Sequence, residues 1–390
     1  MIQGPILIVS ILLLIEIVIL FLSEHAHFKK YFRFLPAVFW IYFIPMLVSS
    51  LGLIDSQSPL YSKITNYFLP ASLFLLLVSV DLKSIFHLGK SALVMFFAGS
   101  FGIMLGIVSV FAIFRRWVGD DFWTGFGALA GSWTGGSANL IAVKEALATP
   151  DAVFLPMVIV DTIVPYVWMG LLVAASSWQH VFDRFNRSDL AVLEKIDQRL
   201  LSIKQSYSSR LYAWSTFFIA GIAVVVGMAI QKVTALMPAI PGVISAFTWT
   251  IIGVSFLGLL CSLTPLRKIE KFGTTRIGYF MLYFVLTTIG AKANIQNIQS
   301  SFILIGAGFL IVIIHAVVLI IAARVIKAPM FLAAVASQAN VGGVASAPIV
   351  AEIYHPGLSA IGLLMAILGN IVGTYIGITT GQICRLITGM

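Results

Sequence analysis

The sequence predicts an all-α polytopic membrane protein made of two repeats, and three observations carry this prediction. Of its 390 residues, 60% are hydrophobic and only 10% are charged, a composition typical of chains that cross a bilayer several times. Apolar runs of roughly 20 residues, long enough to span a hydrocarbon core of about 30 Å, recur along the chain. A Gly-rich polar segment occurs twice, at corresponding places in the two halves.

Ten apolar runs are the predicted spans. They fall near residues 4–22, 34–54, 64–80, 91–114 and 152–175, and near 211–231, 244–264, 276–291, 300–323 and 357–380. The first run contains Glu16 and no basic residue precedes it, so we expect a retained span rather than a cleaved signal peptide. A polar linker separates the halves, and its stretch DRFNRSDLAVLEKIDQRLLSIKQ predicts an amphipathic helix at the membrane surface. The predicted organisation is a first repeat at 1–176, a linker at 177–209 and a second repeat at 210–390.

The Gly-rich segment follows the fourth span of each half. Its first copy, GSWTGGSANLIAVKEAL at 131–147, recurs 207 residues later as QANVGGVASAPIVAEIY at 338–354. We therefore predict two hairpins, at about 124–147 and about 328–353, each either re-entrant or a broken spanning helix. Irregular backbone at membrane depth is tolerated only where it is buried in protein or lines a polar cavity. Two such segments in corresponding positions indicate the binding site of a transporter.

Basic residues in the loops predict the orientation of the repeats. In the first half, the loops after the first and third spans hold five Lys or Arg, and those after the second and fourth hold three. The corresponding counts in the second half are two and six. Because basic loops face the cytoplasm, this reversal predicts inverted topology, with the N-terminus outside and the linker cytoplasmic. A twelve-crossing arrangement with the N-terminus inside is the alternative. Since these loops account for the net charge of +9, we expect no nucleic-acid partner.

The glycine pairs are predicted break points, around which polar residues gather. A helix broken there points an N-terminal dipole at an anion and frees carbonyl oxygens for a cation. The predicted substrate-binding residues are Gly135, Gly136, Ser137, Asn139, Gly342, Gly343, Ser346 and Asn370. The predicted cation-binding residues are Ser132, Thr134, Asp161, Gln338 and Asn340. The alternative interpretation is that the small residues only allow helices to pack closely.

Asp161 is an ionisable residue near the centre of the 152–175 span, where a charge is costly and indicates function. Pro165, four residues later, cannot donate a hydrogen bond to the carbonyl of Asp161. A carboxylate and a free carbonyl oxygen therefore occur at the same depth in the membrane. This pair suits Na⁺ as a ligand, or the carboxylate could carry a proton. The last span offers Asn370 as a polar counterpart. The alternative is a structural aspartate that neighbouring hydroxyls satisfy.

Other chemistries leave no trace in the sequence. It contains no phosphate loop, so ATP on this chain would not drive transport. It also lacks HExxH and GxSxG motifs and any His/Cys/Asp cluster with metal-ligand spacing. We expect no enzyme activity and no cofactor other than Na⁺ or H⁺ as a coupling ion.

The sequences of the two predicted hairpins resemble those of a known family. GSWTGGSANLIAVKEAL and SQANVGGVASAPIVAEIYHP are similar to the membrane proteins grouped as the domain of unknown function 819 family, and the likeness covers nearly the whole chain. The architecture resembles the superfamily of sodium/glutamate symporters, bile-acid/sodium symporters and sodium/proton antiporters. The resemblance implies an elevator-type secondary transporter and a homodimer. It implies no substrate, because the glutamate symporters carry a Gly-Gly-His-Gly-Thr type string where this chain has Ser137, Ala138 and Asn139 after its glycine pair.

We therefore expect sodium-coupled symport of a small organic anion or zwitterion, such as an amino acid or a carboxylate, across a bacterial inner membrane. One alternative is a cation/proton antiporter, or a proton-coupled transporter, that uses Asp161. A second is a non-transporting sensor or channel subunit, although alternating access explains the duplication better. The expected partners are the solute, Na⁺ or H⁺, the lipid bilayer and a second copy of the chain.

Overall fold

The computed structural model of the protein describes most of the chain. The described residues are 4–28, 31–32, 37–82, 85, 88–191, 193, 213–239, 245–292, 301–356 and 358–389. Within these ranges every secondary-structure element is a helix, as the all-α prediction requires. The surface helix predicted over 183–205 is interrupted in its described part, because the helix Gln179–Asn186 ends there and Arg187 has φ of +54°. Residues 192 and 194–205 lie outside the described ranges, as does Lys83, one of the basic residues in the loop after the third span.

Each predicted span coincides with a helix. In the first half these are α1 (Pro5–Glu24), α3 (Ala37–Ser50), α4 (Leu60–Val78), α6 (Gly89–Val118) and α9 (Asp151–Ala175). In the second half they are α12 (Ala213–Thr234), α13 (Ala246–Ser262), α14 (Thr274–Lys292), α15 (Ser301–Ile326) and α18 (Ser359–Thr388). By length and composition, six of the described helices can cross a membrane, namely α1, α6, α9, α12, α15 and α18. A seventh candidate is α13 together with the 3₁₀ helix η2 (Pro265–Phe272).

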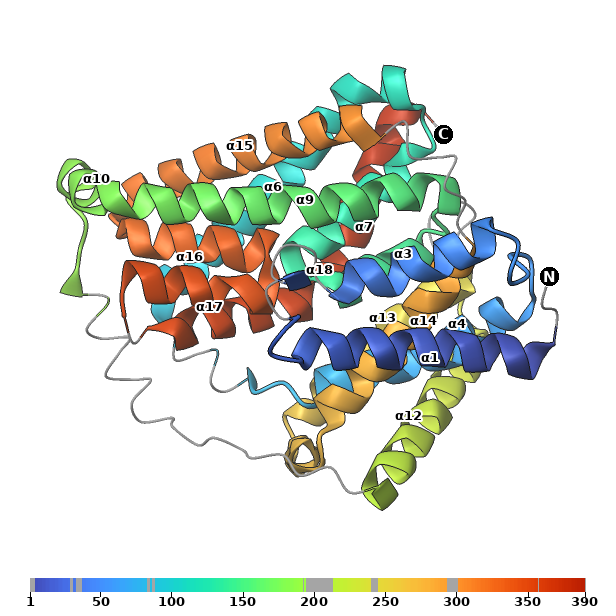
Figure 1. The fold of residues 1–390 in the computed structure, drawn as a ribbon. Helices are drawn as coiled ribbons and strands as arrows, with labels where there is room; N and C mark the ends of the chain where they lie inside the picture. Colours follow the sequence, from blue (N-terminus) through green and yellow to red (C-terminus); the bar gives the residue numbers. More distant parts are fainter. Residues whose placement is uncertain are drawn as a thin grey trace. The chain divides into compact units, whose positions relative to one another are not determined.

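The chain divides into two compact units, each of which draws on both halves (Figure 1). Unit 1 comprises Met1–Val80, Glu145–Thr162 and Tyr207–Ser301, and so holds the first three helices of each half. Unit 2 comprises Asp81–Lys144, Ile163–Ser206 and Phe302–Met390. It holds the fourth helix of each half, most of both hairpin segments, and all or part of each fifth helix. The units therefore cut across the predicted repeats instead of coinciding with them.

In unit 1, α4 and α14 are the central helices. The helix α4 packs against α12, α13 and α14, and α14 also packs against α3. Phe74 and Val78 of α4 and Ile277 and Met281 of α14 belong to one buried cluster. Both helices also bury hydroxyl groups, such as that of Thr288. Because these central helices are covered by protein on several sides, they need less apolar sequence than helices that face lipid.

In unit 2, α18 packs against α6, α7, α16 and α17, where α7 is Phe122–Gly135, α16 is Met330–Val341 and α17 is Gly343–Tyr354. Its contact with α7 runs through glycines. A Cβ added to Gly373 would lie 2.8 Å from the Cα of Gly135. One added to Gly377 would likewise lie 2.8 Å from the Cα of Gly131. Small residues four apart let helix backbones approach this closely, so the packing interpretation holds for these glycines.

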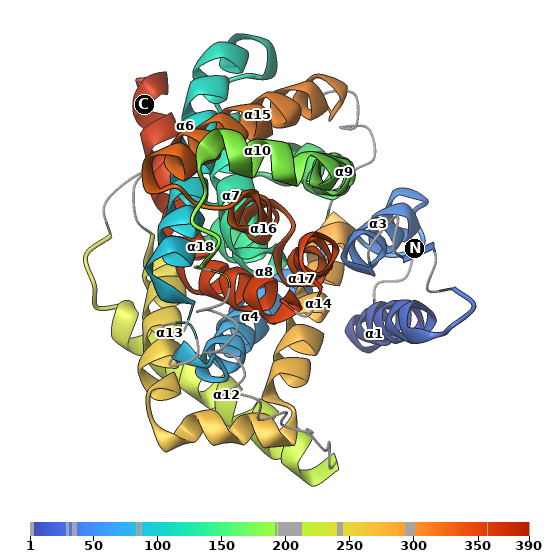
Figure 2. The ribbon, with the colours of Figure 1, turned by 90° about the vertical axis from the view of Figure 1, so that its left-hand side faces the viewer.

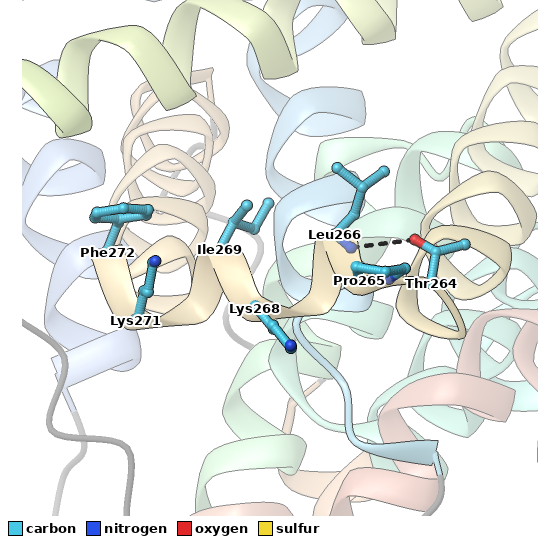
Figure 3. A pocket seen from close by; sticks show the side chains of 7 residues that line it. All are labelled: Thr264, Pro265, Leu266, Lys268, Ile269, Lys271 and Phe272. Atoms are coloured by element: carbon cyan, nitrogen blue, oxygen red, sulfur yellow. Dashed lines mark hydrogen bonds between the residues drawn. The ribbon is translucent and has the colours of Figure 1, made fainter.

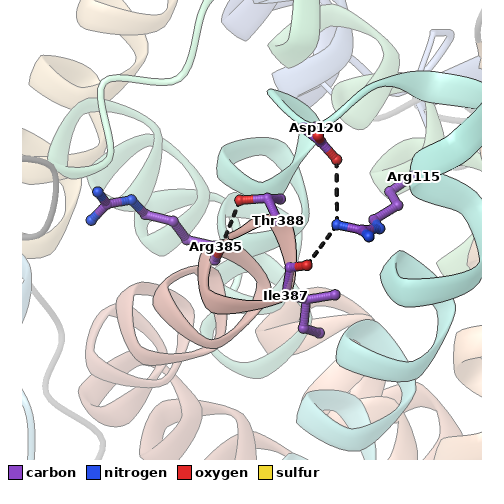
Figure 4. Close-up of polar contacts among 5 residues, drawn as sticks. All are labelled: Arg115, Asp120, Arg385, Ile387 and Thr388. Atoms are coloured by element: carbon purple, nitrogen blue, oxygen red, sulfur yellow. Dashed lines mark hydrogen bonds and ion pairs between the residues drawn. The ribbon is translucent and has the colours of Figure 1, made fainter. Parts of the chain in front are cut away.

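An arginine joins the end of α18 to the end of α6. Arg115 donates from Nη1 to the carbonyl oxygen of Ile387 at 2.6 Å, and the same atom lies 3.7 Å from Oδ1 of Asp120 (Figure 4). Thr388 donates to the carbonyl oxygen of Arg385 at 2.6 Å. The last carbonyl groups of a helix have no partner within the helix, so these bonds cap α18.

The polar linker begins with the short helix α10 (Gln179–Asn186). Oδ1 of Asp183 accepts from the backbone N–H of Met330 at 2.8 Å, at the start of α16. Asn186 donates from Nδ2 to the carbonyl oxygens of Ala323 and Ala328, at 3.2 and 2.9 Å. The start of the linker therefore fixes the N-terminus of the second hairpin within unit 2.

Candidate functional site: the paired helix breaks

Both Gly-rich segments are helix pairs interrupted at the predicted glycines. The first consists of α7 and α8 (Ser137–Ala146), and Gly136 stands between them with φ of +81°. The second consists of α16 and α17, which meet at Gly342 and at Gly343, with φ of +65°. Positive φ is unfavourable for residues with a Cβ, which explains why glycine occupies Gly136 and Gly343.

The chain reverses direction at the first break. A Cβ added to Gly131 would lie 2.8 Å from Cγ2 of Val143. In a continuous helix these two residues would be about 18 Å apart, at 1.5 Å per residue. The helix α8 therefore folds back along α7. The helices α16 and α17 likewise lie side by side (Figures 1 and 2).

The two breaks meet inside unit 2. A Cβ added to Gly343 would lie 3.9 Å from the Cα of Gly136, and one added to Gly136 would lie 3.6 Å from Oδ1 of Asn370 in α18. Four helix ends thus converge: the C-termini of α7 and α16 and the N-termini of α8 and α17. Helix N-termini carry partial positive charge and C-termini partial negative charge. The point where the four ends converge therefore presents partial charges of both signs.

A polar residue on the returning arm bridges each break, and Asn139 does so in the first hairpin. Its Nδ2 donates to the carbonyl oxygen of Gly135 at 2.6 Å and to that of Asn370 at 3.4 Å. Its Oδ1 accepts from the hydroxyl of Thr374 at 2.6 Å. The predicted ligand Asn139 therefore holds the hairpin closed and ties it to α18.

Ser346 occupies the corresponding place in the second hairpin, since both residues stand three positions after the second glycine of the pair. Its hydroxyl oxygen accepts from Nε2 of Gln338 at 2.7 Å. A Cβ on Gly342 would clash with both of these side chains. The small residue at Gly342 is therefore required by the bridge between the arms.

Three buried polar atoms near the breaks have no hydrogen-bond partner among the residues that the structure describes. They are Nε1 of Trp133, Oγ1 of Thr134 and Oε1 of Gln338. Trp133 and Thr134 are 0% exposed and Gln338 is 1% exposed. A buried polar group without a partner costs about 1–3 kcal/mol, and such groups are rare in folded proteins unless they serve a purpose. Together they place one N–H and two oxygen atoms without a described partner beside the breaks.

Asn340, a predicted cation ligand, is used within the protein. Its Nδ2 donates to the carbonyl oxygens of Phe96 and Ala336, at 3.2 and 2.9 Å. Its Oδ1 accepts from the hydroxyl of Ser100 at 2.8 Å. These bonds tie α16 to α6, so Asn340 is a positioning residue in this structure.

A second network holds the other side of α16. His315 of α15 lies 2.8 Å from the carbonyl oxygen of Gly99 through Nδ1 and 2.9 Å from Oγ of Ser337 through Nε2. Trp168 donates from Nε1 to the same Oγ at 2.9 Å. Because a carbonyl only accepts, Nδ1 of His315 carries the proton. Ser337 then accepts from Trp168 and donates to His315, so the polar groups of this network are mutually satisfied.

The remaining predicted residues lie at different places. Ser132 is buried, and its carbonyl oxygen accepts from the backbone N–H of Gly136 at 2.6 Å. Ser137 is half-buried at the start of α8. Asp161 belongs to unit 1, where it is half-buried on α9 directly before Thr162, the last residue of that segment.

Sequence reasoning did not single out Trp133, Ser337 or Thr374. Trp133 stands directly before Thr134 in the first polar string, where its indole reads as apolar bulk although its N–H is a hydrogen-bond donor. The roles of Ser337 and Thr374 depend on partners far away in the chain, so no local sequence pattern predicts them.

The family with the description "Protein of unknown function (DUF819)" matches residues 10–387. The chain belongs to this family. Among curated proteins, this DUF819 chain is similar to "Uncharacterized membrane protein YjcL" of Bacillus subtilis (strain 168). The two are 25% identical over 352 residues, which cover 85% of this chain and 86% of the relative. Together with the six membrane-length helices, this makes the DUF819 chain a multi-pass membrane protein.

Proposed function

We propose that this protein is a secondary active transporter that couples Na⁺ to the symport of a small organic anion or zwitterion. The observation that carries the proposal is the meeting of two helix breaks beside buried polar atoms that lack partners in the described structure. Paired, interrupted helices at corresponding positions of two halves are the binding-site arrangement of many secondary transporters.

The polar atoms are an N–H donor, a hydroxyl that can donate or accept, and an amide oxygen that accepts. Trp133 offers an N–H, which suits a carboxylate, and the N-termini of α8 and α17 add partial positive charge at the breaks. Thr134 and Gln338 offer oxygen atoms, and the C-termini of α7 and α16 add carbonyl oxygens with partial negative charge. An anionic group of the solute is therefore assigned to the first set and Na⁺ to the second.

The division into units supports an elevator mechanism. Unit 2 collects most of both hairpin segments and the fourth helix of each half, whereas unit 1 collects the first three helices of each half. We assign unit 2 to the moving transport domain and unit 1 to the scaffold. Because α9 passes from one unit to the other after Thr162, Asp161 lies next to the hinge of this motion, where its carboxylate couples cation binding to movement.

The proposed oligomeric state, membrane location and topology are those that the sequence predicts. The protein acts as a homodimer in a bacterial inner membrane, with its N-terminus outside, its linker in the cytoplasm and two repeats of inverted topology.

Thermal unfolding of the purified protein across a Na⁺ titration tests the proposal, with K⁺ and choline as control cations. A ligand that binds only the folded state stabilises it by about 2.7 kcal/mol at a hundredfold excess over Kd. We expect a saturable rise in Tm with Na⁺ alone, reduced in Asp161→Asn. Solutes are then screened in saturating Na⁺, where a true substrate raises Tm further.

The outcomes separate the candidates. Sodium coupling is contradicted if Tm does not change with Na⁺ concentration but changes with pH. If that pH dependence is lost in Asp161→Asn, a proton-coupled carrier is favoured. Equal responses to Na⁺, K⁺ and choline contradict a specific cation site altogether.

A further inference from the structure

The 3₁₀ helix η2 leaves the end of α13 at an angle of 97°. Thr264 stands at the corner, where its Oγ1 accepts from the backbone N–H of Leu266 at 3.2 Å and donates to the carbonyl oxygen of Cys261 at 2.7 Å. Pro265 follows and cannot continue the helical bonds of α13. If α13 runs across the bilayer, η2 lies in the plane of the membrane surface.

The 3₁₀ geometry of η2 sorts its side chains by type. With three residues per turn, residues three apart stand above one another. One stripe is therefore apolar, with Leu266, Ile269 and Phe272, while another carries Lys268 and Lys271. Figure 3 shows the apolar side chains on one side of the ribbon and Lys268 on the other. Lys271 turns back over the ring of Phe272, with Nζ 4.8 Å from its centroid.

The charge around η2 is strongly positive. Four basic residues fall within ten positions of the sequence, and Glu270 is the one acid among them; the basic residues are Arg267, Lys268, Lys271 and Arg276. Glu270 accepts from the hydroxyls of Thr274 and Thr275, at 2.5 and 2.8 Å, and from the backbone N–H of Thr275 at 3.0 Å. Its carboxylate is thus engaged at the start of α14.

Exposed leucines accompany the lysines. Leu263 is 57% exposed and Leu266 is 52% exposed, and both lysines are exposed as well. Ile269, by contrast, packs against the buried cluster of unit 1, which anchors η2. An open groove is lined by Thr264 and by six residues of η2, namely Pro265, Leu266, Lys268, Ile269, Lys271 and Phe272 (Figure 3).

We propose that η2 is an interfacial helix that binds the headgroup phosphate of an anionic phospholipid, with Lys268 and Lys271 on the phosphate and Leu263 and Leu266 against the acyl chains. Basic residues beside a membrane helix attract anionic lipids, and lysine stems cover apolar surface while their ammonium groups reach the phosphate. Exposed leucines beside the lysines suit a lipid, whereas a free phosphate ion makes no use of them.

The test uses the full-length protein in mild detergent. Its Tm is followed while short-chain phosphatidylglycerol is added, with phosphatidylcholine and inorganic phosphate as separate arms. Each lysine near the surface contributes about a fivefold factor in lipid binding. The double variant Lys268→Gln, Lys271→Gln therefore requires about 25-fold more phosphatidylglycerol for half of the Tm shift.

Two further variants control for folding and for charge. Lys268→Arg with Lys271→Arg keeps the charges and should keep the wild-type response. Lys63→Gln with Lys232→Gln removes two exposed lysines elsewhere in unit 1 and should also respond like the wild type.

Three results would overturn the proposal. The first is a full phosphatidylglycerol response in the glutamine variant of η2. The second is an equal response to inorganic phosphate, which would make the site one for a free anion. The third is a change in the monomer–dimer ratio of that variant without any change in its lipid response, which would make η2 a contact between copies of the chain.

Discussion

The two hairpins share a sequence pattern, yet they are held in unit 2 by different means. The first hairpin is bound to α18, through Asn139 and through the contacts of Gly131 and Gly135. The second also packs against α18, and its first arm makes hydrogen bonds to three further helices, through Ser337 and Asn340. Both nevertheless break at a glycine with positive φ. The comparison teaches that the break is the common feature, while the anchoring differs between the halves.

The largest expected effect comes from the glycine contact of the first hairpin. A Cβ on Gly369 would overlap the backbone carbonyl oxygen of Thr134, so Gly369→Ala forces α7 and α18 apart. We expect a loss of about 3 kcal/mol of unfolding free energy, at the upper end for overpacking, measured by denaturant unfolding in detergent. The control is Gly306→Ala in α15, where a Cβ meets nothing within 4 Å. If both variants were equally stable, α7 and α18 would not be in close contact.

The bridges across the breaks should differ in strength. Asn139→Ala removes three hydrogen bonds and leaves Thr374 without its acceptor, so we expect a loss of about 2–3 kcal/mol. Ser346→Ala removes one bond, to Gln338, and should lower the unfolding free energy by about 1 kcal/mol. Equal losses in thermal or denaturant unfolding would contradict the difference between the hairpins.

The anchor of the second hairpin is tested at Ser337. Ser337→Ala leaves the Nε1 proton of Trp168 and Nε2 of His315 without their shared partner. A loss of about 1–2 kcal/mol of unfolding free energy is expected, with increased hydrogen exchange of backbone amides in α16 and little change in α7. Similar increases in both hairpins would show that the two anchors are one unit.

The smallest effect is expected at one of the breaks, Gly343. Gly136 and Gly343 have positive φ, but an added Cβ would meet its nearest neighbours at ordinary van der Waals distances of 3.6 and 3.9 Å. Gly343→Ala should therefore lose only about 1 kcal/mol of unfolding free energy, from backbone strain. Gly136→Ala should lose more, because its ψ of −175° lies in a region essentially restricted to glycine. A loss in Gly343→Ala as large as that of Gly369→Ala would mean that the space at this break is filled.

The sequence predicts the helices well, because apolar runs of membrane length and glycine breaks are local signals. It places the breaks at Gly135–Gly136 and Gly342–Gly343, where the structure has them. It does not separate positioning residues from candidate ligands. Asn139 and Asn340 look like ligands in the sequence, but their amides are satisfied by Thr374 and Ser100, which lie more than 200 residues away along the chain. Which polar atom remains without a partner is a property of the tertiary structure.

The central claim is that the oxygen atoms left without partners at the breaks, on Thr134 and Gln338, bind the coupling cation, and Thr134 tests it most directly. Thr134→Val removes a hydroxyl that has no partner in the described structure, whereas Thr380→Val removes one that donates to the carbonyl oxygen of Ile376 at 2.7 Å. The measurement is Tm with and without saturating Na⁺ for both variants. We predict that Thr134→Val keeps or exceeds the wild-type Tm without Na⁺ and loses the Na⁺ response, while Thr380→Val starts lower and keeps the response. A wild-type Na⁺ response in Thr134→Val would contradict the account.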